Sequence, residues 1–266
     1  MFVRLGPVVD PPGSVDVYGH KASPQAVALR FPEVGAFLVS GGREILAEPL
    51  PGLDERVLRL FVLGPALGVL VHQREGIALH GSAALVDGRA VVFLGDSEWG
   101  KSTAAAACYR EGMPLVADDV AWIEGEGIPT IRPAYPQIKL WPDSARALGW
   151  DPDRLRRVHP DVDKVAVRAE EGFPDAPVGV AAVYVLAPGD EGHARPTDLT
   201  PHEAFVELVR HTFTVDLLEA TGQREDHFAR CVALADAVRF RRLPVGSDPA
   251  EARLLPSRIL KDLGSA

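Results

Sequence analysis

The stretch AVVFLGDSEWGKSTAAAACYR, residues 90–110, decides how this chain folds. It joins an apolar run at 90–94 to the pattern G-x-x-x-x-G-K-S at 95–102, and then to a run rich in alanine. An apolar strand before this pattern and a helix after it are the setting in which the pattern forms a phosphate-binding loop. The stretch therefore predicts a strand, a phosphate-binding loop and a helix in that order, and with them an α/β fold.

Each residue type in the loop has a distinct expected role. Gly95 and Gly100 allow the tight turn that points backbone N–H groups at phosphate oxygens. Lys101 is expected to reach the β- and γ-phosphates, and the Ser102 hydroxyl to ligate Mg²⁺. The helix that begins at Lys101 directs the positive end of its dipole at the anion. The residues expected to bind the nucleotide are Gly95, Asp96, Ser97, Glu98, Trp99, Gly100, Lys101, Ser102 and Thr103.

Two residues inside the loop are unusual, because small residues are the rule there. Glu98 would repel a triphosphate unless its side chain points to solvent. Trp99 either stacks on a ligand or covers the edge of the preceding strand, and we favour the second interpretation.

A pair of carboxylates follows the next apolar strand. Residues 114–117 predict a short buried strand, and Asp118 and Asp119 come directly after it. One helix and a turn separate Ser102 from this pair, so a strand–helix–strand unit brings it back to the carboxyl ends of the strands. One carboxylate can then hold Mg²⁺ while the other accepts the proton of an attacking hydroxyl. The alternative is a solvated turn, since Asp is common in turns.

Around this centre the sequence indicates three parts. Residues 1–75 predict a small β-rich segment followed by a helix, which Asp54 caps and Gly64-Pro65 kinks. Residues 76–195 predict the core, with a hairpin about Asp87-Gly88 and a central strand over 180–186. Residues 196–266 predict helices packed on that core.

Helix signals mark the last part of the chain. Thr200 followed by Pro201 and Glu203 forms a capping box, and predicts a helix from there to about Leu218. Further helices are predicted over 224–238 and from the Asp248-Pro249 signal to about residue 263. By contrast, the prolines between residues 142 and 178 predict an irregular and partly mobile stretch.

Composition and charge set the broad class of protein. Hydrophobic residues make up 47% and charged residues 24%, as in ordinary globular proteins, and the formal charge is -9. A chain this acidic has no electrostatic reason to coat nucleic acid or anionic lipid. Two cysteines exclude a disulfide scaffold, and the absence of an apolar leader or span predicts a soluble, cytoplasmic protein. Whether it is a homo-oligomer stays open.

The run from Leu79 to Asp119 resembles the C-terminal catalytic domain of bacterial HPr kinase/phosphorylases. The matching motifs, in the family's order and spacing, are His80-Gly81, Gly95-Asp96-Ser97, Gly100-Lys101-Ser102 and Ala117-Asp118-Asp119. The family's second signature after the Asp pair is missing, and Glu98 stands where a Gly normally follows the loop Ser. The flanks resemble a shorter branch that includes lasso-peptide kinases, on L-G-P-A-L-G at 63–68, L-H-G at 79–81 and P-x-x-K-L-W at 136–141.

The resemblance implies an HPr-kinase/PEP-carboxykinase-like P-loop core with a mixed β-sheet, using ATP and Mg²⁺. It implies transfer of the γ-phosphoryl group to a Ser-type hydroxyl of a peptide or protein, here a lasso-type precursor with a C-terminal Ser. Lys101 would neutralise the phosphates, His80 would position the reacting one, Asp118 would act as base, and Ser102 with Asp119 would ligate Mg²⁺. The division of roles between the two Asp residues is close to even.

Two lysines outside the motifs, Lys139 and Lys164, are candidate substrate-binding residues: each is either a solvated surface residue or neutralises the transferred phosphate. Three other functions also stay open: an HPr-like protein serine kinase, a small-molecule kinase, and a nucleotide-binding protein without catalysis.

Overall fold

The N-terminal part of the computed structural model, which describes residues 1–125, 127–189 and 195–264, is a six-stranded sheet. Its order is β1-β6-β5-β4-β3-β2. The strands are β1 (Phe2–Leu5), β2 (Val15–Val17), β3 (His20–Ala22), β4 (Ala26–Phe31), β5 (Gly35–Ser40) and β6 (Glu44–Pro49). One face buries side chains such as Leu29, Phe37 and Ile45. The predicted β-rich beginning is confirmed.

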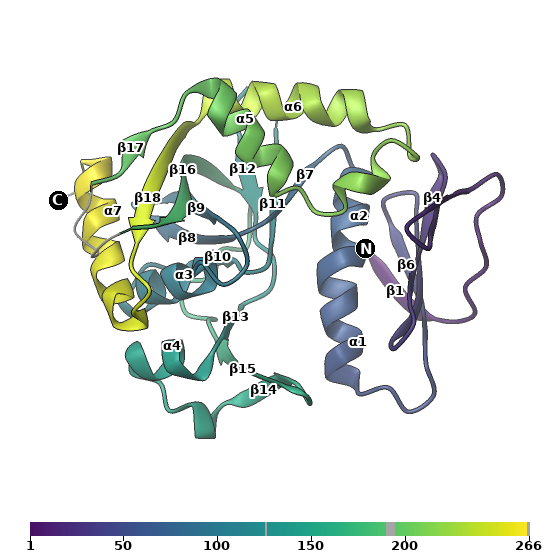
Figure 1. Cartoon of the computed structure of the whole chain (residues 1–266), viewed down its shortest axis with the longest axis horizontal. Coiled ribbons are helices and arrows are strands. Elements are labelled where there is room, and N and C mark those ends of the chain that lie inside the picture. The colour runs from purple at the N-terminus through teal and green to yellow at the C-terminus, as the bar shows by residue number, and fades with distance from the viewer. Residues whose placement is uncertain (126, 190–194, 265–266) are drawn as a thin grey trace.

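A helical rod, residues 55–72, lies between this sheet and the rest of the molecule (Figure 1). It consists of α1 (Glu55–Phe61), a π-helical turn (Val62–Ala66) and α2 (Leu67–His72). The Asp54 side chain accepts the Arg56 N–H at its start, as predicted. The predicted irregularity at Gly64-Pro65 is the π turn, which accommodates a proline that cannot donate an N–H.

The core is a nine-stranded mixed sheet. The order β10-β8-β9-β16-β12-β11-β7 runs across it. In addition, β18 pairs with β16 from Ala182 to Pro188, and β17 pairs with β18. The strands are β7 (Ile77–His80), β8 (Ser82–Val86), β9 (Arg89–Leu94), β10 (Leu115–Ala117), β11 (Val120–Glu124), β12 (Thr130–Arg132), β16 (Val178–Pro188), β17 (Thr197–Asp198) and β18 (Arg239–Val245).

The long strand β16 holds the two halves of this sheet together. Its first residues, Val178 and Gly179, pair with β12, and the residues that follow pair in parallel with β9 and β18. The predicted central strand is thus confirmed. So is the β8–β9 hairpin, where Asp87 and Gly88 both have positive φ, +47° and +77°, as a type I′ turn requires.

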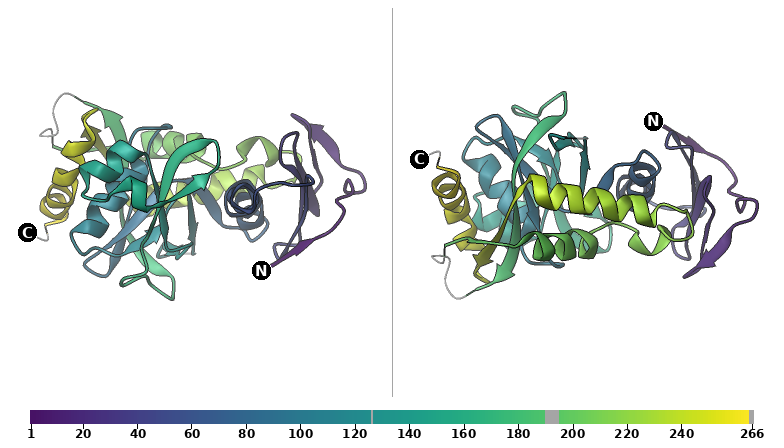
Figure 2. Two further views of the ribbon diagram at one scale, coloured as in Figure 1. Left: turned by 90° about the horizontal axis from the view of Figure 1, so that it is seen from below. Right: turned by 90° about the horizontal axis from the view of Figure 1, so that it is seen from above.

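Helices cover both faces of the sheet, so its central strands read as continuous apolar runs. Along β9, Val91 and Phe93 pack toward α3 (Lys101–Arg110) and α7 (Leu255–Leu263), whereas Val92 and Leu94 face the other side. That other side is covered by α5 (Pro201–Arg210) and α6 (Arg224–Ala237), which cross it toward the N-terminal sheet (Figure 2). Among the described residues no helix is long and apolar enough to cross a membrane.

The prediction of a helix to about Leu218 is wrong in its extent. The capping box of Thr200 and Glu203 is present, but α5 ends at Arg210. The chain then turns to pair with the edge strand β7: the His80 N–H donates to the His211 carbonyl, and the Phe213 N–H to the Ala78 carbonyl. The helix ends here because residues 211–213 form hydrogen bonds with the backbone groups at the edge of β7, which would otherwise have no partner. A short 3₁₀ helix (Val215–Leu217) follows.

The irregular stretch expected between 142 and 178 is largely ordered. It contains α4 (Pro142–Ala147), a 3₁₀ helix (Pro152–Arg154), β14 (Arg156–His159) and β15 (Val162–Arg168), with β15 pairing β13 (Gln137–Leu140) in a three-stranded sheet. The prediction failed because two prolines occupy first helical positions, where the missing N–H costs nothing. The last part of the chain is also not purely helical: besides α5, α6, a 3₁₀ helix (Pro249–Leu254) and α7, it contributes β17 and β18 to the sheet.

Buried histidines make the stability of this fold depend on pH. Burial lowers the pKa of His227 to about 3, and burial together with the charge of Lys101 lowers the pKa of His211 to about 4. In the unfolded chain each histidine takes up its proton near the ordinary pKa of 6.5, whereas in the folded chain it does so only at lower pH. The two histidines therefore do not reduce stability above pH 6.5. As the pH falls to 5, each lowers the free energy of unfolding by about 2 kcal/mol.

We expect the urea midpoint of unfolding to fall markedly between pH 7 and pH 5. A His227→Gln variant should show a smaller fall than the parent chain, because one of the two titrating groups is gone. Equal midpoints of the parent chain at the two pH values would contradict the burial of neutral imidazoles.

Candidate functional site

Two connections between the halves of the sheet bring the candidate site together. The first joins β7 to β8 through Gly81, and the second joins β10 to β11 through Asp118 and Asp119. They touch where the Gly81 N–H donates to the Asp119 carbonyl oxygen, over 3.2 Å. A Cβ at Gly81 would lie 2.8 Å from the Phe93 carbonyl oxygen, so a side chain cannot fit there. This explains the glycine of the His80-Gly81 pair.

The phosphate-loop residues form the turn that the sequence predicts, between β9 and α3. Gly95, Glu98 and Gly100 have φ values of +149°, +69° and +84°. No side chain caps α3, and its first backbone bond runs from the Ala104 N–H to the Gly100 carbonyl. The preceding N–H groups therefore have no helical acceptor, which makes this helix start suited to an anion.

The Lys101 ammonium group lies within the loop. Nζ donates to the Gly95 carbonyl over 2.8 Å and to the Asp96 carbonyl over 2.9 Å. Burial lowers the pKa of Lys101 from its usual value, while the charges of Asp119 and Asp118 act to raise it. Its cation is thus poorly hydrated, and an anion bound in the loop would stabilise it.

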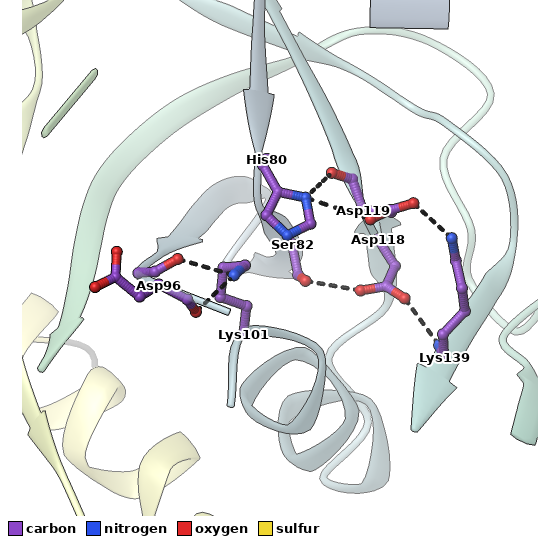
Figure 3. A network of polar contacts seen from close by, with 8 residues as sticks. His80, Ser82, Asp96, Lys101, Asp118, Asp119 and Lys139 are labelled. Carbon is purple, nitrogen blue, oxygen red and sulfur yellow. Dashed lines mark hydrogen bonds and ion pairs between the residues drawn. The ribbon is translucent and has the colours of Figure 1, made fainter. Parts of the chain in front are cut away.

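The two carboxylates have different surroundings (Figure 3). Asp118 is buried: its Oδ1 accepts a hydrogen bond from the Ser82 hydroxyl over 2.7 Å, and its Oδ2 accepts the backbone N–H of Lys139 over 2.8 Å. Asp119 instead faces two basic side chains, with Lys139 Nζ 2.6 Å from Oδ2 and His80 Nδ1 3.3 Å from Oδ1.

Those basic neighbours keep Asp119 ionised. Burial acts to raise the pKa of Asp119, but the hydrogen bond from His80 and the charge of Lys139 outweigh it and hold that pKa well below its usual range. Asp119 also has φ of +80°, in the left-handed region that is costly for a residue with a side chain. Backbone strain of this kind concentrates at functional sites.

One cavity of about 300 Å³ gathers most of the residues that the sequence singled out. Those that line it are His80, Ser97, Glu98, Gly100, Lys101, Ser102, Thr103, Asp118, Asp119, Lys139 and Lys164. Lys164 lies against the ring of Trp141, with Nζ 5.0 Å from its centre, and Trp141 lines the same cavity. The structure therefore brings the loop, the Asp pair, the histidine and both lysines to one place.

Three loop residues lie outside this cavity. Gly95 and Asp96 present carbonyl oxygens to Lys101, and the Asp96 carboxylate pairs with Arg210 over 2.5 Å. Trp99 packs on the core cluster that includes α3, and it does not cover a strand edge, because β9 is paired with β8 on one side and β16 on the other. Glu98 is exposed.

A second cavity, of about 560 Å³, adjoins the loop on its other side. It lies where β16 and β18 end, at Pro188 and Val245, and Trp99 forms part of its wall. Glu98, Gly100, Thr103 and Ser144 line both cavities. Since β9, β16 and β18 are parallel, both cavities lie outside the carboxyl ends of parallel strands, the usual ligand position in such sheets.

Sequence reasoning gave no role to Ser82 or Arg210. Ser82 follows His80-Gly81 at the start of β8, and this adjacency was the one available signal for it. Arg210 is separated from Asp96 by more than a hundred residues, so no local pattern indicates the pair.

The donor set suits a hard cation held jointly with a ligand. Within the described ranges no cluster of three or more His, Cys, Asp or Glu residues forms a metal site. Mg²⁺ commonly takes only one or two carboxylates together with substrate phosphates. A single ionised Asp119 facing the same cavity as the Ser102 hydroxyl fits that pattern.

Comparisons with known proteins leave the family open. No family model matches the chain, and no curated protein matches it. Among solved structures, the HPr(Ser) kinase/phosphatase from Coxiella burnetii is similar with a TM-score of 0.40 and 12% identity, over 69% of this chain and 88% of that chain.

Proposed function

We propose that this chain is an ATP-dependent kinase that transfers the γ-phosphoryl group to a Ser-type hydroxyl of a peptide or protein. The observation that supports this most is the shared cavity, in which an uncapped helix start, a buried lysine and a carboxylate pair face one another. Phosphoryl transfer needs little more than positioning and charge stabilisation, together with a group that accepts the hydroxyl proton.

The nucleotide would span the two cavities. Its phosphates would occupy the loop of residues 95–103, with Lys101 leaving its carbonyl partners to neutralise them. Its nucleoside would enter the adjoining cavity beside Trp99. Ser102 and Asp119 would hold Mg²⁺, which when bound supplies positive charge between the phosphates.

The acceptor hydroxyl would approach from the side of Asp118. Asp118 would accept its proton, because His80 and Lys139 engage Asp119 and hold its pKa well below its usual range, which makes Asp119 a poor base. The Lys139 ammonium group pairs with Asp119 over 2.6 Å. During transfer it would pair instead with the phosphoryl group and stabilise its negative charge. His80 would position that phosphate.

The acceptor itself comes from the resemblance of the flanking motifs, which indicates a lasso-type precursor peptide ending in Ser. We expect incubation with ATP, Mg²⁺ and such a peptide to add one phosphate, seen by intact mass. If an HPr-like protein or a small molecule is phosphorylated and the peptide is not, the kinase activity stands and the peptide is the wrong acceptor. No transfer to any of these, together with no binding of ATP, would overturn the proposal.

A further inference from the structure

A groove of about 720 Å³ leads away from the candidate site. It passes between the helical rod and the side of the core formed by β11, β13 and β14. Leu60, Asp118, Lys139 and Val158 line both the groove and the 300 Å³ cavity, so the groove opens onto the Asp118 carboxylate.

The groove is lined mainly by positive charges, although the whole chain is negatively charged. The chain has 28 basic and 37 acidic residues, yet seven basic residues line the groove against two acidic ones, Glu55 and Asp118. Apolar side chains that include Leu63 and Leu67 line the same groove. A lining that combines cationic and apolar side chains suits a ligand that is both acidic and partly apolar.

Two of the groove arginines have no carboxylate partner among the described residues. Arg74 and Arg156 form no ion pair there, although Arg74 Nε donates to the Gly42 carbonyl oxygen. The other four groove arginines form ion pairs with carboxylates at the surface, and these pairs are Arg56–Asp54, Arg59–Glu55, Arg132–Glu124 and Arg157–Asp163. Ion pairs exposed to solvent are weak, so a ligand carboxylate can compete for them.

The position of Asp118 limits the shape of the occupant. Its residue is 9% exposed, at the inner end of the groove. A hydroxyl at the end of an extended segment lying in the groove can reach it.

We propose that this groove binds an extended acidic peptide, with apolar side chains between its carboxylates, and delivers its terminal Ser hydroxyl to Asp118. The assignment rests on the proposed kinase function and adds the acceptor's chemistry and path. A nucleic acid fits less well, because the ring of Trp122 already has the guanidinium groups of Arg74 and Arg132 against it, 5.5 and 5.1 Å from its centre. Little of that ring is left for a base to stack on.

The test measures peptide binding without nucleotide. A fluorescently labelled peptide of alternating Glu and Leu ending in Ser is titrated with the full chain, and anisotropy is recorded. Arg156→Glu should weaken binding roughly tenfold or more, since it replaces a charge-assisted contact by repulsion. A peptide with Gln in place of Glu should bind the parent chain correspondingly more weakly.

Arg154→Glu is the matched control. It makes the same charge change two residues away, on a side chain that is 86% exposed and outside the groove. We expect it to bind the peptide as the parent does. Arg74→Gln is a second variant that neutralises the other unpaired charge, and thermal unfolding verifies that each variant is folded.

The outcomes separate the groove from the kinase. Equal binding by the parent and the folded Arg156→Glu and Arg74→Gln variants, or equal losses in Arg154→Glu and Arg156→Glu, would overturn the groove assignment while leaving phosphoryl transfer intact. Peptide binding that depends on Arg156, without any transfer from ATP, would support the groove and overturn the kinase. A labelled single-stranded oligonucleotide that binds more tightly than the peptide, and loses binding in Arg156→Glu, would overturn the peptide in favour of nucleic acid.

Discussion

Replacing Lys101 with Ala is expected to lower phosphoryl transfer roughly a hundredfold or more while the chain stays folded. The ammonium group lies in the loop beside the uncapped start of α3, where the phosphates would bind. Its loss removes the charge that stabilises the transferred phosphate. The loop conformation itself depends on Gly95 and Gly100, whose positive φ values the substitution does not affect.

The measurement is the initial rate of peptide phosphorylation, with circular dichroism to verify the fold. Lys261→Ala, on the exposed face of α7, is the matched control and should keep the parent rate. Near-normal turnover by folded Lys101→Ala would rule out the loop as the phosphate site.

Asp118→Asn is expected to lower transfer by roughly 10²–10⁴-fold, the usual contribution of a general base, with little change in ATP affinity. The structure explains why this variant should fold. The new amide can direct its oxygen at the Lys139 N–H and its NH₂ at the Ser82 hydroxyl, which can accept as well as donate. Both hydrogen bonds survive, and only the proton-accepting ability is lost.

Asp119→Asn should act differently, by weakening Mg²⁺-dependent nucleotide binding, since a neutral amide is a poorer ligand for a hard cation. A titration of Mg²⁺ against activity distinguishes the two variants. If excess Mg²⁺ rescues Asp118→Asn and not Asp119→Asn, the two roles are exchanged. If neither substitution affects transfer, the pair has no part in the chemistry.

Elements specified by neighbouring residues were predictable from the sequence. The loop at 95–102, the hairpin at Asp87-Gly88 and the caps at Asp54 and Thr200 each depend on a few adjacent side chains, and each appears where it was predicted.

Elements decided by distant partners were not predictable in the same way. The end of α5 depends on β7, whose backbone groups draw residues 211–213 out of the helix. The strand β18 reads poorly as a strand because Arg239, Arg241 and Arg242 interrupt it, and it forms because β16 offers a parallel edge.

The residues of the candidate site were predictable from the sequence, but most of their contacts were not. His80, Lys101 and the Asp pair stand out by motif, and they share one cavity. What Asp118 and Asp119 contact depends on strand register instead, because Lys139 reaches them from β13 and Ser82 from β8. The groove arginines come from four separate segments of the chain, so no sequence window contains their pattern.

The rod between the two sheets makes the N-terminal part indispensable to the rest. Its α2 buries one face against the N-terminal sheet through Val69 and Leu70, and the other against β7 and β11, where Val71 meets Ala78 and Val120. Its Gly64 is close enough to the site that an added methyl group would lie 3.8 Å from Asp119 Oδ2. Removing residues 1–75 would expose the apolar side chains of β7 and β11 that α2 covers, and it would remove one wall of the groove. The mixed sheet and its candidate site are therefore not a portable module, and a fusion or shortened version of this protein must carry the first 75 residues with it.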